Sequence, residues 1–256
     1  MKVNYKRVVQ SVKKNYVLYG CLASLLLLFL YLAQNTKDST LAFRGSIPAK
    51  PWMDPREVAV VQQYLDKSKT MLEYGSGGST RYYAPKTGRY VSIESDVEWC
   101  NGVKRELNIG KAGSDYEHVS MICQKPEVDP LPCKTFVNSW DWLFGRCYTK
   151  LSEVNRYVTA PSTFFPDLRY DVVLVDGRGR PQCAVEALPL LKTDTSVVLI
   201  HDWLNRDQYH VVLNFFDIVD QTTESNQSGG GGIVSLRPKS NWREIYRTWD
   251  PPSWWN

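Results

Sequence analysis

The sequence predicts a doubly wound α/β domain with a mostly parallel sheet, preceded by one N-terminal membrane-spanning helix. Short apolar runs alternate with helix-forming segments through residues 51–256. A glycine-rich turn follows the first of these runs, as it does where a strand of a parallel sheet leads into a helix. Near the N-terminus, the uncharged and leucine-rich segment 16–33 follows a basic one, residues 1–15.

The segment 16–33 is predicted to be a signal anchor. At 1.5 Å per residue it spans about 27 Å, which is just enough for a bilayer core. The basic residues before it favour a cytoplasmic N-terminus, so we expect a single-pass type II membrane protein with a lumenal domain. A cleaved signal peptide is the alternative, but no small-residue cleavage site follows Ala33.

Charge and composition place one domain after the anchor. Residues 34–50 are polar and aperiodic and predict a stem, and residues 51–256 suffice for a single α/β domain with a sizeable core. The net charge is +4, and residues 1–15 carry five basic and no acidic side chains, so the rest of the chain carries −1. No basic stripe is visible, and we expect no nucleic-acid partner.

The first half of the domain predicts three helices and three strands. An Asp-Pro pair at 54–55 caps a helix that runs to Leu65, because proline suits the first helical position. A proline and a glycine keep a helix near Thr80 short. Asp96 caps a third helix, which runs to Leu107. The strands between them are Thr70–Tyr74, Arg89–Glu94 and Tyr116–Cys123.

The second half begins with a break in the pattern. Residues 124–150 are rich in proline and aromatic side chains, and we interpret them as an insertion near the active face. The continuous apolar run Asp171–Val175 is typical of a buried parallel strand. The remaining predicted helices are Leu151–Tyr157, Ala184–Leu191 and Gln208–Phe216, and the remaining strands are Ser196–Ile200, Phe216–Gln221 and Ile233–Arg237.

A nucleoside-binding pattern lies at the first strand. The strand carries Glu73 and then turns through Gly75-Ser76-Gly77, and Glu94 follows 19 residues after Gly75. Glycine lets the backbone approach a ligand, and an acid about 20 residues further on can hold ribose hydroxyls. A dinucleotide fingerprint has a third glycine where Thr80 stands here, which weakens the NAD interpretation.

The order acid-x-Gly-x-Gly followed by Glu94 resembles class I S-adenosylmethionine-dependent methyltransferases. Residues 171–177 and 197–202 look like the fourth and fifth strands of that family, so the resemblance covers most of residues 70–238. It implies a Rossmann-like, seven-stranded sheet closed by the antiparallel pair 216–221 and 233–237. It also implies that S-adenosylmethionine is bound by Glu73, Gly75, Ser76, Gly77, Glu94, Ser95 and Asp176.

The resemblance places the chemistry at Asp176, His201 and Asp202. His201 is the natural general base, since its unperturbed pKa is about 6.5, and Asp202 can orient it or act itself. Acids after these strands hold a divalent metal in cation-dependent O-methyltransferases, which suggests a metal at Asp176 and Asp202. That family usually has an Asp-Asn pair where this chain has His201-Asp202.

An acidic acceptor is suggested by the charged and aromatic residues near these strand ends. Arginine recognises carboxylates by a bidentate fork, and tryptophan offers a flat face to sugars. The candidate substrate-binding residues are Arg178, Arg180, Trp203 and Arg206, with Trp140 and Trp142 as further sugar platforms. Pairing of the arginines with neighbouring acids is the alternative. Together with the predicted type II membrane topology, these arginines and tryptophans favour O-methylation of a glycan or another hydroxyl acceptor in the Golgi lumen.

Two other functions remain open at this point. A nucleotide-sugar oxidoreductase or epimerase is disfavoured by the missing third glycine and by the lack of a Tyr-x-x-x-Lys pair. A non-catalytic, membrane-anchored binding protein is the other possibility. Cys123, Cys133 and Cys147 cluster in the proline-containing stretch, where an oxidising lumen would allow a disulfide. Asn226 begins a glycosylation sequon.

Overall fold

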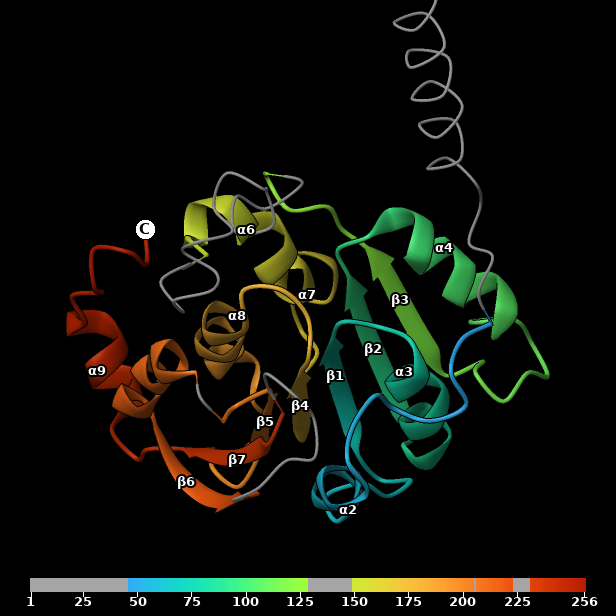
Figure 1. Ribbon diagram of the computed structural model, residues 1–256, viewed down its shortest axis with the longest axis horizontal. Coiled ribbons are helices and arrows are strands. Elements are labelled where there is room, and N and C mark those ends of the chain that lie inside the picture. The colour runs from blue at the N-terminus through green and yellow to red at the C-terminus, as the bar shows by residue number, and fades with distance from the viewer. Residues whose placement is uncertain (1–45, 129–148, 205, 223–230) are drawn as a thin grey trace, which may run out of the picture. The chain divides into compact units, whose positions relative to one another are not determined.

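A mixed, seven-stranded sheet forms the centre of the domain (Figure 1). The computed structural model describes residues 46–128, 149–204, 206–222 and 231–256. The strands are β1 Thr70–Tyr74, β2 Arg89–Glu94, β3 Val119–Cys123, β4 Val172–Val175, β5 Val197–His201, β6 Phe216–Gln221 and β7 Ile233–Pro238. Their order is β3-β2-β1-β4-β5-β7-β6, with β1 to β5 parallel and β7 antiparallel to both of its neighbours. This confirms the predicted sheet.

The direction of the chain across the sheet reverses between β1 and β4. The chain moves from β1 outward to β2 and β3, and later returns to place β4 on the other side of β1. Ligands of open α/β sheets bind outside the carboxyl ends of the strands at such a switch point. The loops after β1 and β4 are therefore the first place to look for a site.

Helices cover both faces of the sheet. They are α2 Pro55–Gln62, α3 Gly78–Tyr83, α4 Val97–Glu106, α6 Leu151–Val158, α7 Ala160–Phe164, α8 Arg180–Glu186 and α9 Trp242–Thr248. Short 3-10 segments occupy Ala84–Lys86, Leu188–Leu190 and Asp207–Asn214. An α-helix was predicted over Gln208–Phe216, where the structure has the 3-10 segment Asp207–Asn214, and α7 was not predicted.

Helix α8 begins four residues before the predicted start at Ala184. Pro181 lies in its first turn, where a missing backbone N–H costs no hydrogen bond, so the proline starts this helix. Helix α2 also differs from its prediction: it ends at Gln62, three residues before the predicted Leu65. These boundary differences leave the order of elements unchanged.

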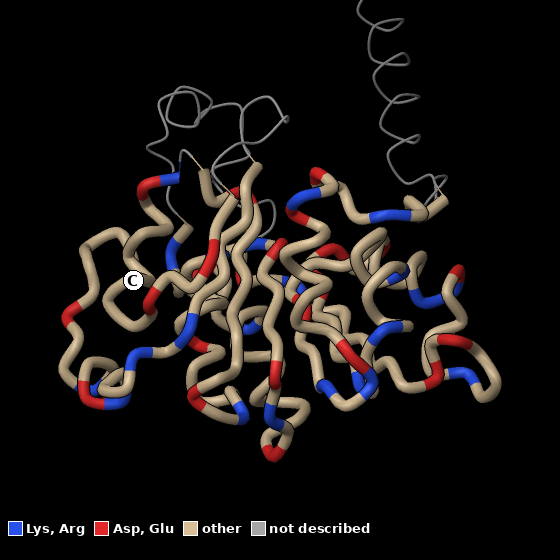
Figure 2. The backbone as a smooth tube through the Cα atoms, turned by 90° about the horizontal axis from the view of Figure 1, so that it is seen from below, with Lys and Arg blue, Asp and Glu red and all other residues tan. Residues whose placement is uncertain are grey.

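Alternate residues of the strands fill two apolar cores. Leu72 and Tyr74 of β1 face the core formed with α6, α8 and the C-terminal residues, whereas Met71 faces the core formed with α2. Both faces are buried, as expected for parallel strands. The aromatic tail belongs to the first core, where the rings of Trp249 and Trp255 lie 4.8 Å apart. Charged residues of both signs are interspersed over the described part of the chain, and the central strands are mostly uncharged (Figure 2).

Residues 46–50 pack on the domain, although they were expected to end the stem. Ile47 is 1% exposed, its N–H donates to both carboxylate oxygens of Glu106, and its carbonyl accepts from Arg81. The chain from Gly45 to Asn256 forms one compact unit. The predicted anchor at 16–33 lies outside the described residues, as do Trp140, Trp142 and Asn226. Among the helices that are described, none is both long and apolar enough to cross a bilayer.

Candidate active site

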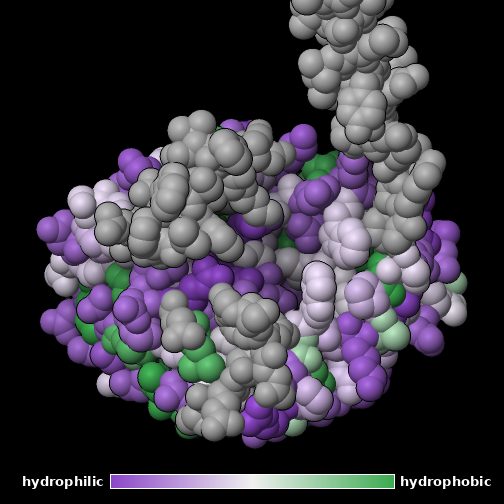
Figure 3. Space-filling view, viewed as in Figure 1, coloured by the Kyte–Doolittle hydropathy of each residue, from purple (hydrophilic) through white to green (hydrophobic). Residues whose placement is uncertain are grey.

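A polar cavity of about 280 Å³ opens at the carboxyl ends of β1, β2 and β4. It lies at the switch point of the sheet, where a ligand site is expected. In the space-filling view, hydrophilic residues gather around the hollow of this face (Figure 3). The lining residues are Gly75, Ser76, Ser79, Glu94, Ser95, Asp96, Asp176, Gly177, Arg178 and Arg180.

The turn after β1 requires glycine for two reasons. Gly75 has a φ of +93° and Gly77 a φ of +149°, and residues with a Cβ rarely adopt such positive φ angles. A Cβ on Gly75 would also lie 2.9 Å from the backbone nitrogen of Gly177. The backbones after β1 and β4 thus meet at the cavity. The indole of Trp99 donates to the carbonyl of Ser76 at 2.8 Å and fixes the far side of the turn.

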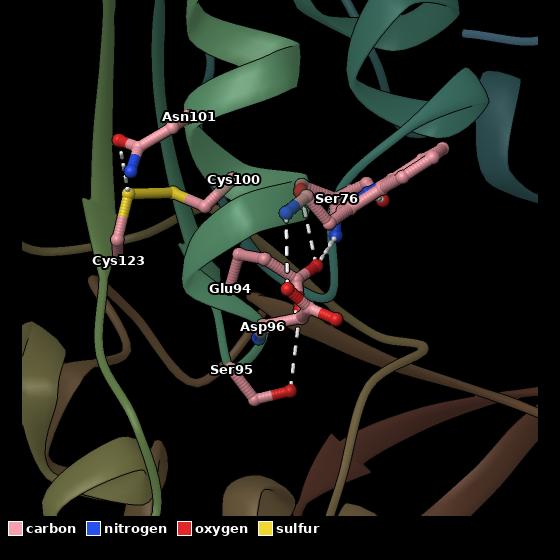
Figure 4. The surroundings of a disulfide bond; sticks show 8 residues. Ser76, Glu94, Ser95, Asp96, Cys100, Asn101 and Cys123 are labelled. Atoms are coloured by element: carbon pink, nitrogen blue, oxygen red, sulfur yellow. Dashed lines mark hydrogen bonds between the residues drawn. A yellow bond between two sulfur atoms is a disulfide. The ribbon is translucent and has the colours of Figure 1, made fainter. Parts of the chain in front are cut away.

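Glu94 fastens the glycine turn to the end of β2. Its Oε2 accepts from the N–H of Ser76 at 2.8 Å and from the Ser76 hydroxyl at 3.0 Å. Its Oε1 accepts from the hydroxyl of Ser95 at 3.2 Å and from the N–H of Asp96 at 2.9 Å (Figure 4). The carboxylate is only 8% exposed and still lines the cavity. The four donors that hold the carboxylate are two backbone N–H groups and two hydroxyls, and none of them is charged.

Glu73 lies beneath the turn and not in the cavity, which corrects the expectation that it contacts a cofactor. It is fully buried, and its Oε2 accepts from the hydroxyls of Thr80 at 2.6 Å and Ser92 at 2.8 Å. Burial raises the pKa of Glu73 to about 7, against the effect of hydroxyl donors such as Ser79. The Thr80 hydroxyl also accepts from the N–H of Gly77 at 3.1 Å. Thr80, which replaces the third glycine, therefore links Glu73 to the turn.

A disulfide joins Cys100 of α4 to Cys123 at the end of β3, with the two Cα atoms 5.6 Å apart (Figure 4). A disulfide was considered among Cys123, Cys133 and Cys147, but Cys123 pairs with a residue 23 positions earlier, and Cys133 and Cys147 lie outside the described residues. Cys123 lies opposite Glu94 in the β2–β3 register. The disulfide thus secures the helix that begins directly after the carboxylate-bearing strand end.

His201 lies between two carboxylates, so both of its ring nitrogens are engaged. Nδ1 is 2.9 Å from Asp176 Oδ1, and Nε2 is 3.3 Å from Glu57 Oε2. The residue is 4% exposed. Burial disfavours the charged ring, but the charge and hydrogen bond of Asp176, together with the bond to Glu57, raise its pKa to about 9. At neutral pH the ring is an imidazolium, whereas the expected general base would need a free nitrogen.

Glu57 was missed as a site residue. It occupies the third position of α2 and completes a capping box with Asp54, whose N–H donates to Glu57 Oε2 at 2.7 Å. The same side chain accepts from the N–H of Gly232 before β7. Burial raises the pKa of Glu57, but the hydrogen bonds from His201 and the Asp54 N–H lower it further than burial raises it. In the sequence, the only signal at Glu57 was its place in the capping box, which gives no indication of the contact with His201.

Arg180 pairs with the two acids that were predicted to be catalytic. Its Nη1 is 2.8 Å from Asp202 Oδ2, and its Nη2 is 3.2 Å from Asp176 Oδ1. Burial raises the pKa of Asp202, but Arg180 and His201 lower it more. Asp202 has a φ of +53°, and its Oδ1 accepts from the N–H of Gly231 at 3.0 Å. The structure therefore brings Asp176, His201 and Asp202 together, and it gives Arg180 to the acids instead of a substrate carboxylate.

The other predicted substrate-binding residues are divided. Arg178 lines the cavity. Arg206 follows the β5 end, where its charge contributes to lowering the pKa of Asp202, and its guanidinium lies 6.0 Å from the ring of Tyr209. Trp203 is 4% exposed and packs against His210 with ring centroids 4.7 Å apart. Its burial corrects the expectation that it offers a face to the acceptor.

Comparison with known proteins gives structural neighbours only. No known family profile matches the chain, and no curated protein is detectably similar to it in sequence. A methyltransferase-like protein from Silicibacter pomeroyi is 23% identical, with 80% of this chain and 100% of that chain covered and a TM-score of 0.48. An O-methyltransferase from Bacillus cereus in complex with SAH is 14% identical, with 75% and 84% covered and a TM-score of 0.46. An rRNA methylase from Streptococcus thermophilus is 11% identical, with 73% and 98% covered and a TM-score of 0.45.

Proposed function

We propose that the chain is an S-adenosylmethionine-dependent methyltransferase whose cofactor binds in the cavity at the ends of β1, β2 and β4. One observation carries the proposal. The Gly75–Gly77 turn and the Glu94 carboxylate are joined by hydrogen bonds and line the same cavity. A backbone that passes close to the ligand and an acid at the ribose are the two parts that a nucleoside cofactor requires.

The residues present fit this cofactor. Glu94 would hold the ribose, and the hydroxyls of Ser76 and Ser95, which bond to it, can rotate away to free its lone pairs. Asp96 and Ser95 line the cavity beyond it, where the adenine would lie. The bound cofactor supplies a methyl group on a sulfonium, which makes the transfer an in-line displacement. The chain mainly has to align the two reactants.

The charges at the β4 and β5 ends favour a cationic ligand. Glu57, Asp176 and Asp202 lie against the cations His201 and Arg180, with Arg206 nearby. The wall of the cavity itself carries three acids, Glu94, Asp96 and Asp176, against the two arginines Arg178 and Arg180, which leaves one negative charge in excess on the wall. Asp176 lies on the cavity wall. A sulfonium near this wall is stabilised by the excess charge, whereas the neutral thioether product is not. The product should therefore bind more weakly than the cofactor.

We further propose an oxygen acceptor, such as a glycan hydroxyl, for a lumenal, Golgi-located domain on a single-pass type II anchor. The uncharged segment 16–33 with its basic flank supports the anchor. The disulfide between Cys100 and Cys123 supports an oxidising compartment, because cytosolic thiols are kept reduced. Since His201 is held between acids, proton removal from the acceptor falls to Asp176 or Asp202, which are partly exposed.

The test is cofactor binding by the full chain in detergent, measured by isothermal titration. S-adenosylmethionine should bind, and Glu94→Ala should weaken it at least tenfold, because a hydrogen bond to a charged group contributes about 1.5–3 kcal/mol. Glu98→Ala is the matched control, since Glu98 is an exposed acid in the first turn of α4 and does not line the cavity. NAD binding that depends on Glu94, with no binding of S-adenosylmethionine, would reject the proposal.

A further inference from the structure

An arginine occupies the place where a divalent metal was predicted. One ligand atom from each of Asp176, His201 and Asp202 lies within 4.8 Å of the others, a grouping that is able to hold a metal ion. Yet the guanidinium of Arg180 lies 3.2 Å from Asp176 and 2.8 Å from Asp202. The two carboxylates therefore already share a cation, and this cation belongs to the chain.

Arg180 is held in this position from several sides. Its Nε donates to the carbonyl of Gly177 at 3.2 Å, and its Nη1 also donates to the carbonyl of His201. Gly179, with a φ of +53°, precedes it and turns the chain into α8. The side chain is only 13% exposed. Removing it from between the acids would break its two ion pairs and two hydrogen bonds and take away the cation that the two partly buried carboxylates share.

The rest of the ligand set does not suit a metal either. A histidine ligand must offer a free lone pair on one ring nitrogen. Here Nδ1 faces Asp176 at 2.9 Å and Nε2 faces Glu57 at 3.3 Å, so each nitrogen already lies against a carboxylate oxygen. Asp202 Oδ1 is also occupied, by the N–H of Gly231. A metal would have to displace Arg180 and these hydrogen bonds together.

We infer that Arg180 supplies the cation between Asp176 and Asp202 at the ends of β4 and β5, and that the site works without a divalent metal. The inference rests on the proposed function for its catalytic meaning, but the metal-binding behaviour that it predicts does not. Arg180 acts as a positioning residue: its planar guanidinium bridges Asp176, which lines the cavity, to Asp202 at the end of β5. It differs from a metal in offering hydrogen bonds in place of open coordination positions.

The experiment uses Mn²⁺ as the probe and the full chain in detergent, with binding followed by electron paramagnetic resonance. The unmodified chain should show no stoichiometric site in the micromolar range. Arg180→Ala should create a site that binds Mn²⁺ at least tenfold more tightly, because it releases Asp202 Oδ2 and Asp176 from the guanidinium, and two carboxylates with water can hold the ion without His201. Adding Asp202→Asn to Arg180→Ala should remove that site again. Arg169→Ala replaces an exposed arginine that precedes β4, whereas Asp176 follows that strand, and it should leave Mn²⁺ binding as it is.

The outcomes separate the two proposals. A micromolar Mn²⁺ site in the unmodified chain that Asp202→Asn removes would overturn the inference, and so would a folded Arg180→Ala variant without a site. Arg180→Gln, which keeps an amide donor, replaces Arg180→Ala if the latter does not fold, and the same gain is expected. Titration with S-adenosylmethionine is run on the same samples. Its failure would reject the methyltransferase proposal while leaving the Mn²⁺ results to decide the role of Arg180.

Discussion

The substitution Gly75→Ala tests the geometry of the glycine turn most directly. Gly75 has a φ of +93°, and a positive φ costs a residue with a side chain about 1–2 kcal/mol. Its Cβ would also lie 2.9 Å from Gly177 N and 3.0 Å from the carbonyl carbon and oxygen of Asp176. These atoms are backbone and cannot rotate away, so relief of the overlap costs roughly a further 1–3 kcal/mol. We expect a total loss of about 2–5 kcal/mol in the free energy of unfolding.

Gly113→Ala is the matched control. Gly113 has a φ of +78°, but a Cβ there would meet nothing within 4 Å. It should therefore lose only the backbone contribution, about 1–2 kcal/mol. Urea denaturation of both variants, compared at equal m-values, gives the difference. Gly75→Ala should also weaken S-adenosylmethionine at least tenfold, whereas Gly113→Ala should not. Equal destabilisation with unchanged binding in both variants would refute the close approach of β1 and β4 at the cavity.

Three further predictions concern the disulfide and the buried ionisable groups. Cys100→Ser should lower the free energy of unfolding by about 3 kcal/mol, measured by urea denaturation without reductant, because the disulfide closes a loop with a sequence separation of 23. Folding raises the pKa of His201 from 6.5 to about 9, so the stability it contributes, roughly 3 kcal/mol, is complete below pH 6.5 and lost as the pH rises through 9. His201→Gln should flatten stability across that window. Folding likewise raises the pKa of Glu73 from 4.5 to about 7, so Glu73→Gln should flatten the fall in stability between pH 4.5 and 7. Unchanged pH profiles would contradict the assigned environments.

Local signals in the sequence were enough to predict most of the sheet. The bounds of β1 and β2 agree with the prediction because each is an apolar run followed by a turn. Asp96 caps α4 as expected, with its Oδ1 accepting from the N–H of Trp99 at 3.0 Å. Helix α9 was not predicted, although its core-facing residues Trp242, Ile245 and Tyr246 have helical spacing, because seven residues are a shorter window than a periodicity argument needs.

The charged network at the site was beyond such signals. His201 and Glu57 are 144 positions apart, and their contact follows from the sheet order and the docking of α2. Arg180 was expected to face a substrate because arginines beside a reaction centre often do so, but its proximity to Asp202 arises only once β4 and β5 lie side by side. The choice between a substrate contact and an internal ion pair thus required the fold.

The contacts of Glu57 have a consequence for the biosynthesis of the protein. Glu57 belongs to the first helix of the domain, and it accepts a hydrogen bond from Gly232, 175 positions later in the chain. Translation proceeds from the N-terminus, so Glu57 is synthesised long before Gly232, the donor to its Oε1. A nascent or prematurely terminated chain that lacks Gly232 leaves one Glu57 oxygen unpaired near His201. The charged centre is therefore among the last parts of the domain to be completed, and products that end before Gly232 lack the donor to Glu57 Oε1.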